Sequence, residues 1–331
     1  MKPISKLGIG PMSQEIIEAV YRYSENNSEP LMLIASKNQI DWSGGYVNDW
    51  TTRQFAEYCN VLKKKYPKAK VYLCRDHCGP GFKNDDINDV YKTINDDLDN
   101  GFEVIHIDFC HYKGVYEERL AESKKAIEHI LKKKPGTIIE IGTDENKGDF
   151  LTNIKHVDSE MEFFKKVAPI HFFVCQTGSL IKEVNQAGAF NTEFLKKIKD
   201  LSVKYDFCLK EHNADYLDSR SVAMRKGIID AVNVAPQYGI IQTTLTLSKC
   251  YAYGINVDDY LEDAYMSGKW KKWLKKNDQN NKYLCSVIAG HYNFAKDSYK
   301  KIYKEINKYE DFRETIIKEI MNNIDIYIKN F

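Results

Sequence analysis

The chain has 331 residues, and its 48 Lys and Arg residues almost balance its 47 Asp and Glu residues, leaving a formal net charge of +1. This balance predicts no nucleic-acid partner and no anionic membrane partner. The apolar runs are far shorter than the roughly 20 residues that a membrane-spanning helix needs, and the first residues do not resemble a signal peptide. We therefore expect a soluble, cytoplasmic protein without a membrane partner.

The predicted elements alternate along the chain, short apolar runs with longer amphipathic stretches. Apolar runs of this length, bounded by turn residues, are typical of strands buried in a parallel sheet. In chain order, the strand-like runs are 7–10, 30–36, 71–81, 103–110, 137–145, 170–178, 207–215 and 229–237. The stretches predicted to be helices are 13–21, 52–65, 85–100, 117–134, 157–167 and 190–205.

Eight strand-like runs separated by helices predict an α/β protein with a single (β/α)8 TIM barrel. After Gly239 the pattern changes to a long, helix-rich tail. We place the barrel in residues 1–245 and a helical C-terminal extension, packed on the barrel, in residues 246–331. Polar residues gather at the carboxyl end of almost every run, where barrels of this kind carry their active sites.

The eight cysteines do not form a disulfide scaffold in a chain of this length. Cys74, Cys110, Cys175 and Cys208 lie inside or at the end of apolar runs, and no pair has the C-x-x-C spacing. Buried, reduced thiols account for this pattern, which argues against a zinc ion held by several thiolates.

The third run ends in Asp76 and His77 and continues into a Gly-Pro-Gly turn at 79–81. Neighbouring residues at a strand end point to opposite faces or to different parts of the loop. One of the two can then hold a metal while the other moves a proton beside it. The alternative is a turn aspartate next to a capped histidine.

Three further groups near strand ends are candidates for the site. His106 and Asp108 share one face of the fourth run, either as a pair that orients a metal ligand or as a satisfied core pair. Lys210 and His212 lie two residues apart and also share a face, so Lys210 is a candidate substrate contact. In the tail, His291 is a candidate to fold over the barrel mouth.

Several short motifs occur in the order found in one known family. They are Asn-Gln at 38–39 with Gly-Gly at 44–45, Asp-His-Cys-Gly-Pro at 76–80, and Glu-His-Asn-Ala-Asp-Tyr at 211–216. Together they resemble the class II ketose-bisphosphate aldolases, and most closely the tagatose-bisphosphate aldolase Z-subunit branch, often labelled non-catalytic. The resemblance covers roughly residues 7 to 240 as a series of short matches.

The resemblance implies a divalent metal, zinc or alternatively manganese, bound by His77 and His212. It also implies that Asp76 exchanges a proton with a substrate hydroxyl. A metal at such a site polarises a ketose carbonyl and stabilises the enediolate that forms when the adjacent carbon–carbon bond breaks.

In this family a glutamate at the end of the fifth strand also lies near the metal. Glu140, Asp144 or Glu145 are the candidates for its place. We assign Asp144 to the metal and Glu145 to catalysis. The substrate contacts predicted from the other strand ends are Asn38, Gln39, Lys210, Asp215, Asn233 and Gln237.

Two positions depart from the family pattern. Active members carry a His-Gly pair after the sixth strand, whereas this chain has Gln176, a poorer zinc ligand that we keep in the metal set. Their phosphate-binding Gly-Gly-Ser turn after the seventh strand is replaced by Asn-Ala-Asp at 213–215, and a carboxylate there would repel a phosphate.

Three functions remain open at this point. The first is a metal-dependent aldolase that acts on a sugar or sugar phosphate, and the second is a ketose epimerase that works by retro-aldol cleavage, rotation and re-addition. The third is a non-catalytic partner subunit of a tagatose-bisphosphate aldolase. The resemblance thus leaves open a homo-oligomer or a hetero-oligomer with a catalytic aldolase subunit.

Overall fold

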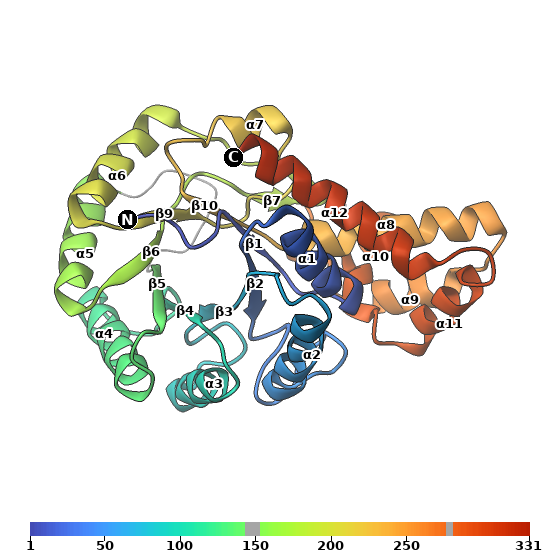
Figure 1. Cartoon of the computed structure of the whole chain (residues 1–331), viewed down its shortest axis with the longest axis horizontal. Coiled ribbons are helices and arrows are strands. Elements are labelled where there is room, and N and C mark those ends of the chain that lie inside the picture. Colours follow the sequence, from blue (N-terminus) through green and yellow to red (C-terminus); the bar gives the residue numbers. More distant parts are fainter. Residues whose placement is uncertain (143–152, 276–280) are drawn as a thin grey trace.

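Eight parallel strands close into a barrel, with helices on its outside (Figure 1). The computed structural model describes residues 1–142, 153–275 and 281–331. The barrel strands are β1 Leu7–Ile9, β2 Leu31–Ser36, β3 Val71–Cys78, β4 Val104–Asp108, β5 Ile138–Gly142, β6 Ile170–Val174, β9 Cys208–Glu211 and β10 Ala231–Val234. Their order around the barrel is β1-β10-β9-β6-β5-β4-β3-β2. Every predicted strand-like run contains one of them, which confirms the predicted (β/α)8 barrel.

Helices follow the strands where the sequence predicts them. The side chain of Thr51 accepts a hydrogen bond from the Gln54 backbone N–H, while the Gln54 side chain accepts one from the Thr51 N–H. This reciprocal cap fixes the start of α2 at the predicted residue. The helices over this part of the chain are α1 Gln14–Asn27, α2 Thr52–Lys65, α3 Ile87–Asp99, α4 Tyr116–Lys133, α5 Ile154–Val167, α6 Thr192–Tyr205 and α7 Ser219–Ala223.

Two small elements were not predicted. A hairpin of β7 Ile181–Lys182 and β8 Asn185–Gln186 lies between β6 and α6, and α7 lies between β9 and β10. Elements of two and five residues are too short to show a periodic pattern in the sequence.

The interior of the barrel changes from apolar to polar along the strands. Its apolar layer includes Val104, Cys208 and Ala231, which pack together with residues of other strands. Because side chains of a strand repeat their direction every two residues, the next inward positions are His106, Lys210 and Asn233. A buried polar layer therefore covers the apolar one on the side of the strands' carboxyl ends.

The predicted helical extension follows β10 and packs on the barrel (Figure 1). Its last helix runs back beside α1, where Arg313 binds Glu15 and Glu18 through charge-assisted hydrogen bonds. Residue 245 lies inside α8, so the division of the chain at that point stays a prediction. The elements are α8 Pro236–Tyr253, α9 Asp258–Met266, α10 Lys282–Ala289, the 3-10 helix η1 Gly290–Asn293, α11 Asp297–Ile306 and α12 Phe312–Asn330.

All eight cysteines are free thiols, which confirms that part of the sequence prediction. Seven of them are buried, but the predicted burial of Cys110 is wrong, because it lies just after the end of its strand and is partly exposed. None of the helices described has both the length and the apolar character required to cross a membrane.

Candidate metal centre and active site

The end of β3 departs from regular strand geometry at the pair singled out from the sequence. The pairing of β3 with β4 shifts register between Arg75 and Cys78, and His77 has a positive φ of 50°. A bulge of this kind re-aims side chains. As a result Asp76 and His77 do not separate to opposite faces: His77 Nε2 lies 3.7 Å from Asp76 Oδ2.

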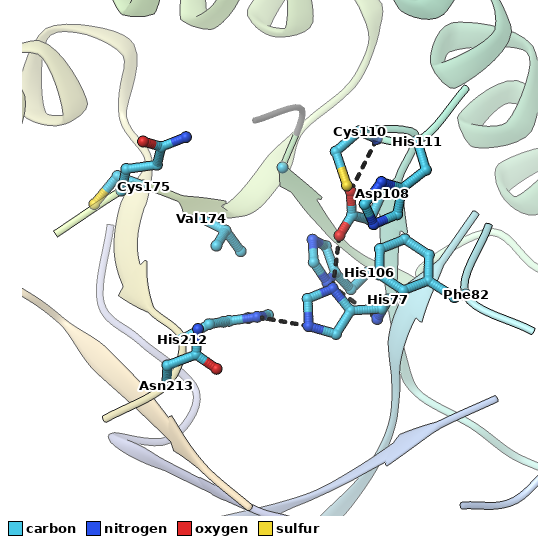
Figure 2. A pocket seen from close by; sticks show the side chains of 12 residues that line it. His77, Phe82, His106, Asp108, Cys110, His111, Val174, Cys175, His212 and Asn213 are labelled. Carbon is cyan, nitrogen blue, oxygen red and sulfur yellow. Dashed lines mark hydrogen bonds and ion pairs between the residues drawn. The ribbon is translucent and has the colours of Figure 1, made fainter. Parts of the chain in front are cut away.

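Two histidines from different strands face each other at this point. His212, directly after β9, places its Nδ1 3.3 Å from His77 Nε2 (Figure 2). Each ring is held from behind by a carboxylate: His77 Nδ1 lies 2.6 Å from Asp108 Oδ2, and His212 Nε2 lies 2.9 Å from Glu140 Oε1. Carboxylates commonly hold metal-binding histidines in this way, which leaves the opposite nitrogen free for a cation.

Asp76 and His106 complete a group of four side chains with His77 and His212. One potential ligand atom from each of these residues lies within 4.8 Å of all the others. Two nitrogens bound to a tetrahedral zinc ion at 2.0–2.1 Å are about 3.3 Å apart, and the facing nitrogens of His77 and His212 have this separation. The residues present therefore fit a divalent metal ion.

The charges around the group also favour a cation. Burial acts to lower the pKa of His77, but the charge of Asp76 and the hydrogen bond to Asp108 outweigh it and raise that pKa to about 9. Burial opposes ionisation of Asp108 as well, yet the contact with His77 lowers its pKa to about 2. Asp76 is likewise held well below its usual pKa by His77 and His212 despite its burial. The site is thus built to hold positive charge between carboxylates.

The polar layer beneath the histidines supports them. Lys210 Nζ lies 2.6 Å from Glu140 Oε2, and both side chains are fully enclosed. Burial would raise the pKa of Glu140, but Lys210 and His106 lower it to about 2, so that Glu140 stays a strong acceptor for His212. Asn233 adds a contact of 3.0 Å from its Nδ2 to His212 Nε2 and one of 3.4 Å to Asp76 Oδ1.

His106 takes a more central place than the sequence suggested. We predicted it to orient a ligand together with Asp108; Asp108 contacts His77, whereas His106 itself belongs to the group of four. The backbone N–H of His77 donates to His106 Nδ1, and His106 Nε2 is buried without a hydrogen-bond partner among the described residues. A Cβ at Gly142 would come 3.0 Å from that atom, so a larger residue there would crowd the His106 ring.

Two joined spaces open from the group toward solvent. A small cavity of about 160 Å³ is lined by His77, His106, His212 and Gln176, among others (Figure 2). A larger one of about 720 Å³ also reaches Asp76 and His77 and includes Asn38 and Gln39 on its wall. The structure therefore brings Asn38 and Gln39 to the same space as the candidate metal group, as a substrate contact requires.

Other predicted substrate contacts lie away from these cavities. Asp215 is buried and accepts hydrogen bonds from the backbone N–H groups of Ala235 and Gln237. The side-chain oxygen of Gln237 accepts from the Tyr216 N–H and the Tyr327 hydroxyl. These contacts tie the ends of β9 and β10 to the last helix, so both residues hold the frame of the site. Asp215 is not among the residues that line either cavity, and its predicted effect on a phosphate stays a prediction.

The predicted ligand Gln176 lines the small cavity together with the three histidines, and its part in metal binding stays a prediction. Asp144 and Glu145, assigned to metal binding and catalysis, lie outside the described residues. Sequence reasoning also missed how Glu211 is used: Arg225 binds it with two nitrogens, and the Thr177 hydroxyl donates to it. This network connects the segment after β6 to the strand that ends just before His212, and no short sequence motif predicts it.

A closed barrel with histidines and carboxylates gathered at the carboxyl ends of its strands defines a (β/α)8 protein with a candidate divalent-metal centre. A family model described as Fructose-bisphosphate aldolase class-II matches residues 9–310. The chain therefore belongs to the class II fructose-bisphosphate aldolase family, which confirms the resemblance inferred from its motifs.

Solved structures share the fold at low sequence identity. A probable tagatose 6 phosphate kinase from Sinorhizobium meliloti 1021 is 13% identical, with a TM-score of 0.80 over 99% of this chain and 100% of that chain. Fructose-bisphosphate aldolase from Campylobacter jejuni is 14% identical, with a TM-score of 0.65 over 99% and 90%. Fructuronate-tagaturonate epimerase UxaE from Cohnella laeviribosi is 12% identical, with a TM-score of 0.63 over 98% and 81%. At such identities the likeness shows the fold alone.

Proposed function

We propose that this protein is a divalent-metal-dependent enzyme that makes or breaks a carbon–carbon bond next to the carbonyl of a ketose or ketose phosphate. The observation that carries the proposal is the convergence of Asp76, His77, His106 and His212 at the active face of the barrel. Family membership supports the same chemistry. Zinc suits the imidazole nitrogens best, with manganese as the alternative.

A divalent cation in this group would polarise the ketose carbonyl and stabilise the enediolate that forms as the bond breaks. The chain supplies the proton transfer. Asp76 is ionised at neutral pH because the histidines around it lower its pKa, and it lies on the wall of the larger cavity. It is therefore placed to take the proton of a substrate hydroxyl as the bond breaks and to return it on re-addition.

Epimerisation is the second candidate, and the shape of the larger cavity favours it. Tyr46 follows β2 and stacks edge-on against Tyr292 of the extension, with ring centroids 4.6 Å apart. Both residues line the cavity, so that the extension encloses the space in front of Asp76. An enclosed aldehyde fragment can rotate and be added back in the opposite sense before it escapes. The UxaE structure with the same fold is named as an epimerase.

The test is turnover of a ketose panel by the metal-loaded protein, followed by NMR. Release of a three-carbon fragment supports cleavage, whereas a ketose inverted at one carbinol carbon without free fragments supports epimerisation. Asp76→Asn should abolish turnover and keep the metal. The control Asp297→Asn, whose side chain is 91% exposed, should retain full activity.

Two results together would replace the proposal with the partner-subunit function. The metal-loaded protein alone would show no turnover, and turnover by a separate aldolase chain would rise when this protein is added.

A further inference from the structure

The outer wall of the larger cavity belongs to the C-terminal extension rather than to the barrel. The segment 268–273 and the 3-10 helix η1 face the loops that follow β2 and β3. This wall contains three lysines, Lys269, Lys271 and Lys272, and one histidine, His291. None of these four residues takes part in the metal group, so their chemistry is available for another purpose.

Lys272 is a cation without an acidic partner. Its Nζ lies 4.4 Å from the centre of the Trp273 ring, and no carboxylate of the described residues pairs with Lys269, Lys271 or Lys272. The side chain is exposed on the cavity wall, and partial desolvation by the protein around it lowers the pKa of Lys272. By contrast, Lys83 on the same cavity wall is bound to Asp41. Ammonium groups that line a cavity without a counter-ion make the cavity positive there and favour an anion in it.

His291 provides a second, independent sign of a ligand. Its side chain is 1% exposed, and neither ring nitrogen makes a hydrogen bond within the described part of the chain. Tyr292, with its ring centroid 4.1 Å away, and the nearby backbone of Gly239 hold the ring in place on the cavity wall. Burial and the charge of Lys272 outweigh an opposing contact with the Ile288 backbone and lower the pKa of His291 to about 3, so the ring is neutral and offers one donor and one acceptor. Buried polar groups without partners are rare in folded proteins and call for a ligand.

The cavity is therefore polarised along its length. Asp76 lies at the inner end beside the candidate metal group, Asn38 and Gln39 lie on the wall, and the lysines lie on the extension. We propose that the extension forms an anion subsite, in which Lys272 and His291 bind a phosphate or carboxylate at the end of the ketose far from its carbonyl. The inference rests on the proposed function for the position of the carbonyl end. Lys269 and Lys271 add to the positive field that attracts the substrate.

The experiment measures binding of three probes by calorimetry to the metal-loaded protein: D-fructose, D-fructose 6-phosphate and D-fructuronate. The probes share the ketone end and differ at the terminal carbon far from it. We expect at least one anionic probe to bind at least tenfold more tightly than D-fructose. Lys272→Met should remove at least tenfold of that affinity and leave D-fructose binding unchanged. The control Lys282→Met changes the net charge equally within the same extension but removes a lysine that is paired with Glu262, and it should bind all probes normally.

His291→Gln should weaken the anionic probe by several-fold, and the thermal midpoints of all variants show whether they are folded. Preference for the 6-phosphate identifies a phosphate subsite, and preference for the uronate identifies a carboxylate subsite. Either of two results would overturn the inference. The wild type could bind all three probes with equal affinity, or Lys272→Met and Lys282→Met could lose anion binding equally. Metal content, measured on the same samples, reports separately on the proposed function. A full metal site without a preference for anions would contradict the anion subsite but not the proposed function.

Discussion

Strand β3 carries one buried and one partly exposed polar group, Arg75 and His77, and the two differ in the kind of partner that the protein gives them. Arg75 points toward the helices, where its Nε and Nη2 bind the two oxygens of Asp97 at 2.7 and 2.6 Å and its Nη1 binds the carbonyls of Ala35 and Ile40. His77, two residues later, points to the barrel mouth and has one nitrogen on Asp108 while the other faces His212. Both groups have partners for their polar atoms, but one partner of His77 is a second imidazole rather than a carboxylate or a carbonyl.

The difference separates a structural ion pair from a ligand site. A buried arginine with a bidentate carboxylate leaves no atom for a ligand, so its contribution is to the stability of the fold. Two imidazole nitrogens 3.3 Å apart need a proton or a cation between them. A pair of facing imidazoles at the carboxyl end of the barrel strands therefore indicates the functional group.

The largest expected effect comes from breaking the Arg75–Asp97 ion pair. Arg75→Met leaves Asp97 buried without its partner and should lower the free energy of unfolding by about 3–5 kcal/mol. Urea unfolding measures the change, and the folded fraction should still bind metal normally. Arg53→Met is the control, because the Arg53 side chain is 76% exposed and should change stability little. A loss below 1 kcal/mol for Arg75→Met would contradict the structural role.

Asp215 lies between the two cases, since it accepts two backbone hydrogen bonds but no described cation pairs with it. Burial outweighs these bonds and raises its pKa to about 7 from a usual 3.8. The stability it contributes is complete below the unfolded pKa and is lost as the pH rises through 7, because the unfolded chain releases this proton first.

Asp215→Asn keeps both hydrogen bonds and removes this loss. Its stability relative to the wild type should increase by about 2–3 kcal/mol between pH 5 and pH 8, measured by urea unfolding at each pH. A stability difference that does not change with pH would show that the pKa of Asp215 is not raised.

A smaller effect is expected when the support of one metal-binding histidine is only weakened. Asp108→Asn can still accept the hydrogen bond from His77 Nδ1 but removes the negative charge behind that ring. Metal affinity should fall about 10–100-fold, as for other groups that hold a metal-binding histidine. A competitive chelator titration gives the affinity, with Asp297→Asn as the control. Unchanged affinity would place Asp108 outside the metal centre.

The barrel could be predicted because each of its signals is local. The strand-like runs depend on neighbouring residues, and the Asp-His pair at the end of β3 lies inside one run. His212 was found through its family motif. The sequence therefore contained the elements of the barrel and two of its facing histidines.

The remaining assignments depend on contacts between distant residues. The bulge that turns His77 beside Asp76 depends on the pairing of β3 with β4, and the place of His106 in the group of four depends on that bulge. Asp215 follows His212 closely in the sequence, yet it is not on the cavity wall, because the segment after β10 offers it two backbone donors, Ala235 and Gln237. Where such partners come from other strands, the direction of a side chain cannot be read from its own neighbours.

The most direct test of a metal centre is elemental analysis of protein purified without chelators, with the variants His77→Ala, His212→Ala and Asp76→Asn. His129→Ala is the control, since His129 lies on α4 outside the group. We predict about one zinc or manganese ion per chain in the wild type, the control and Asp76→Asn, and loss of the ion in His77→Ala and His212→Ala. No bound metal in the wild type, or a metal content that does not depend on His77 and His212, would contradict the account.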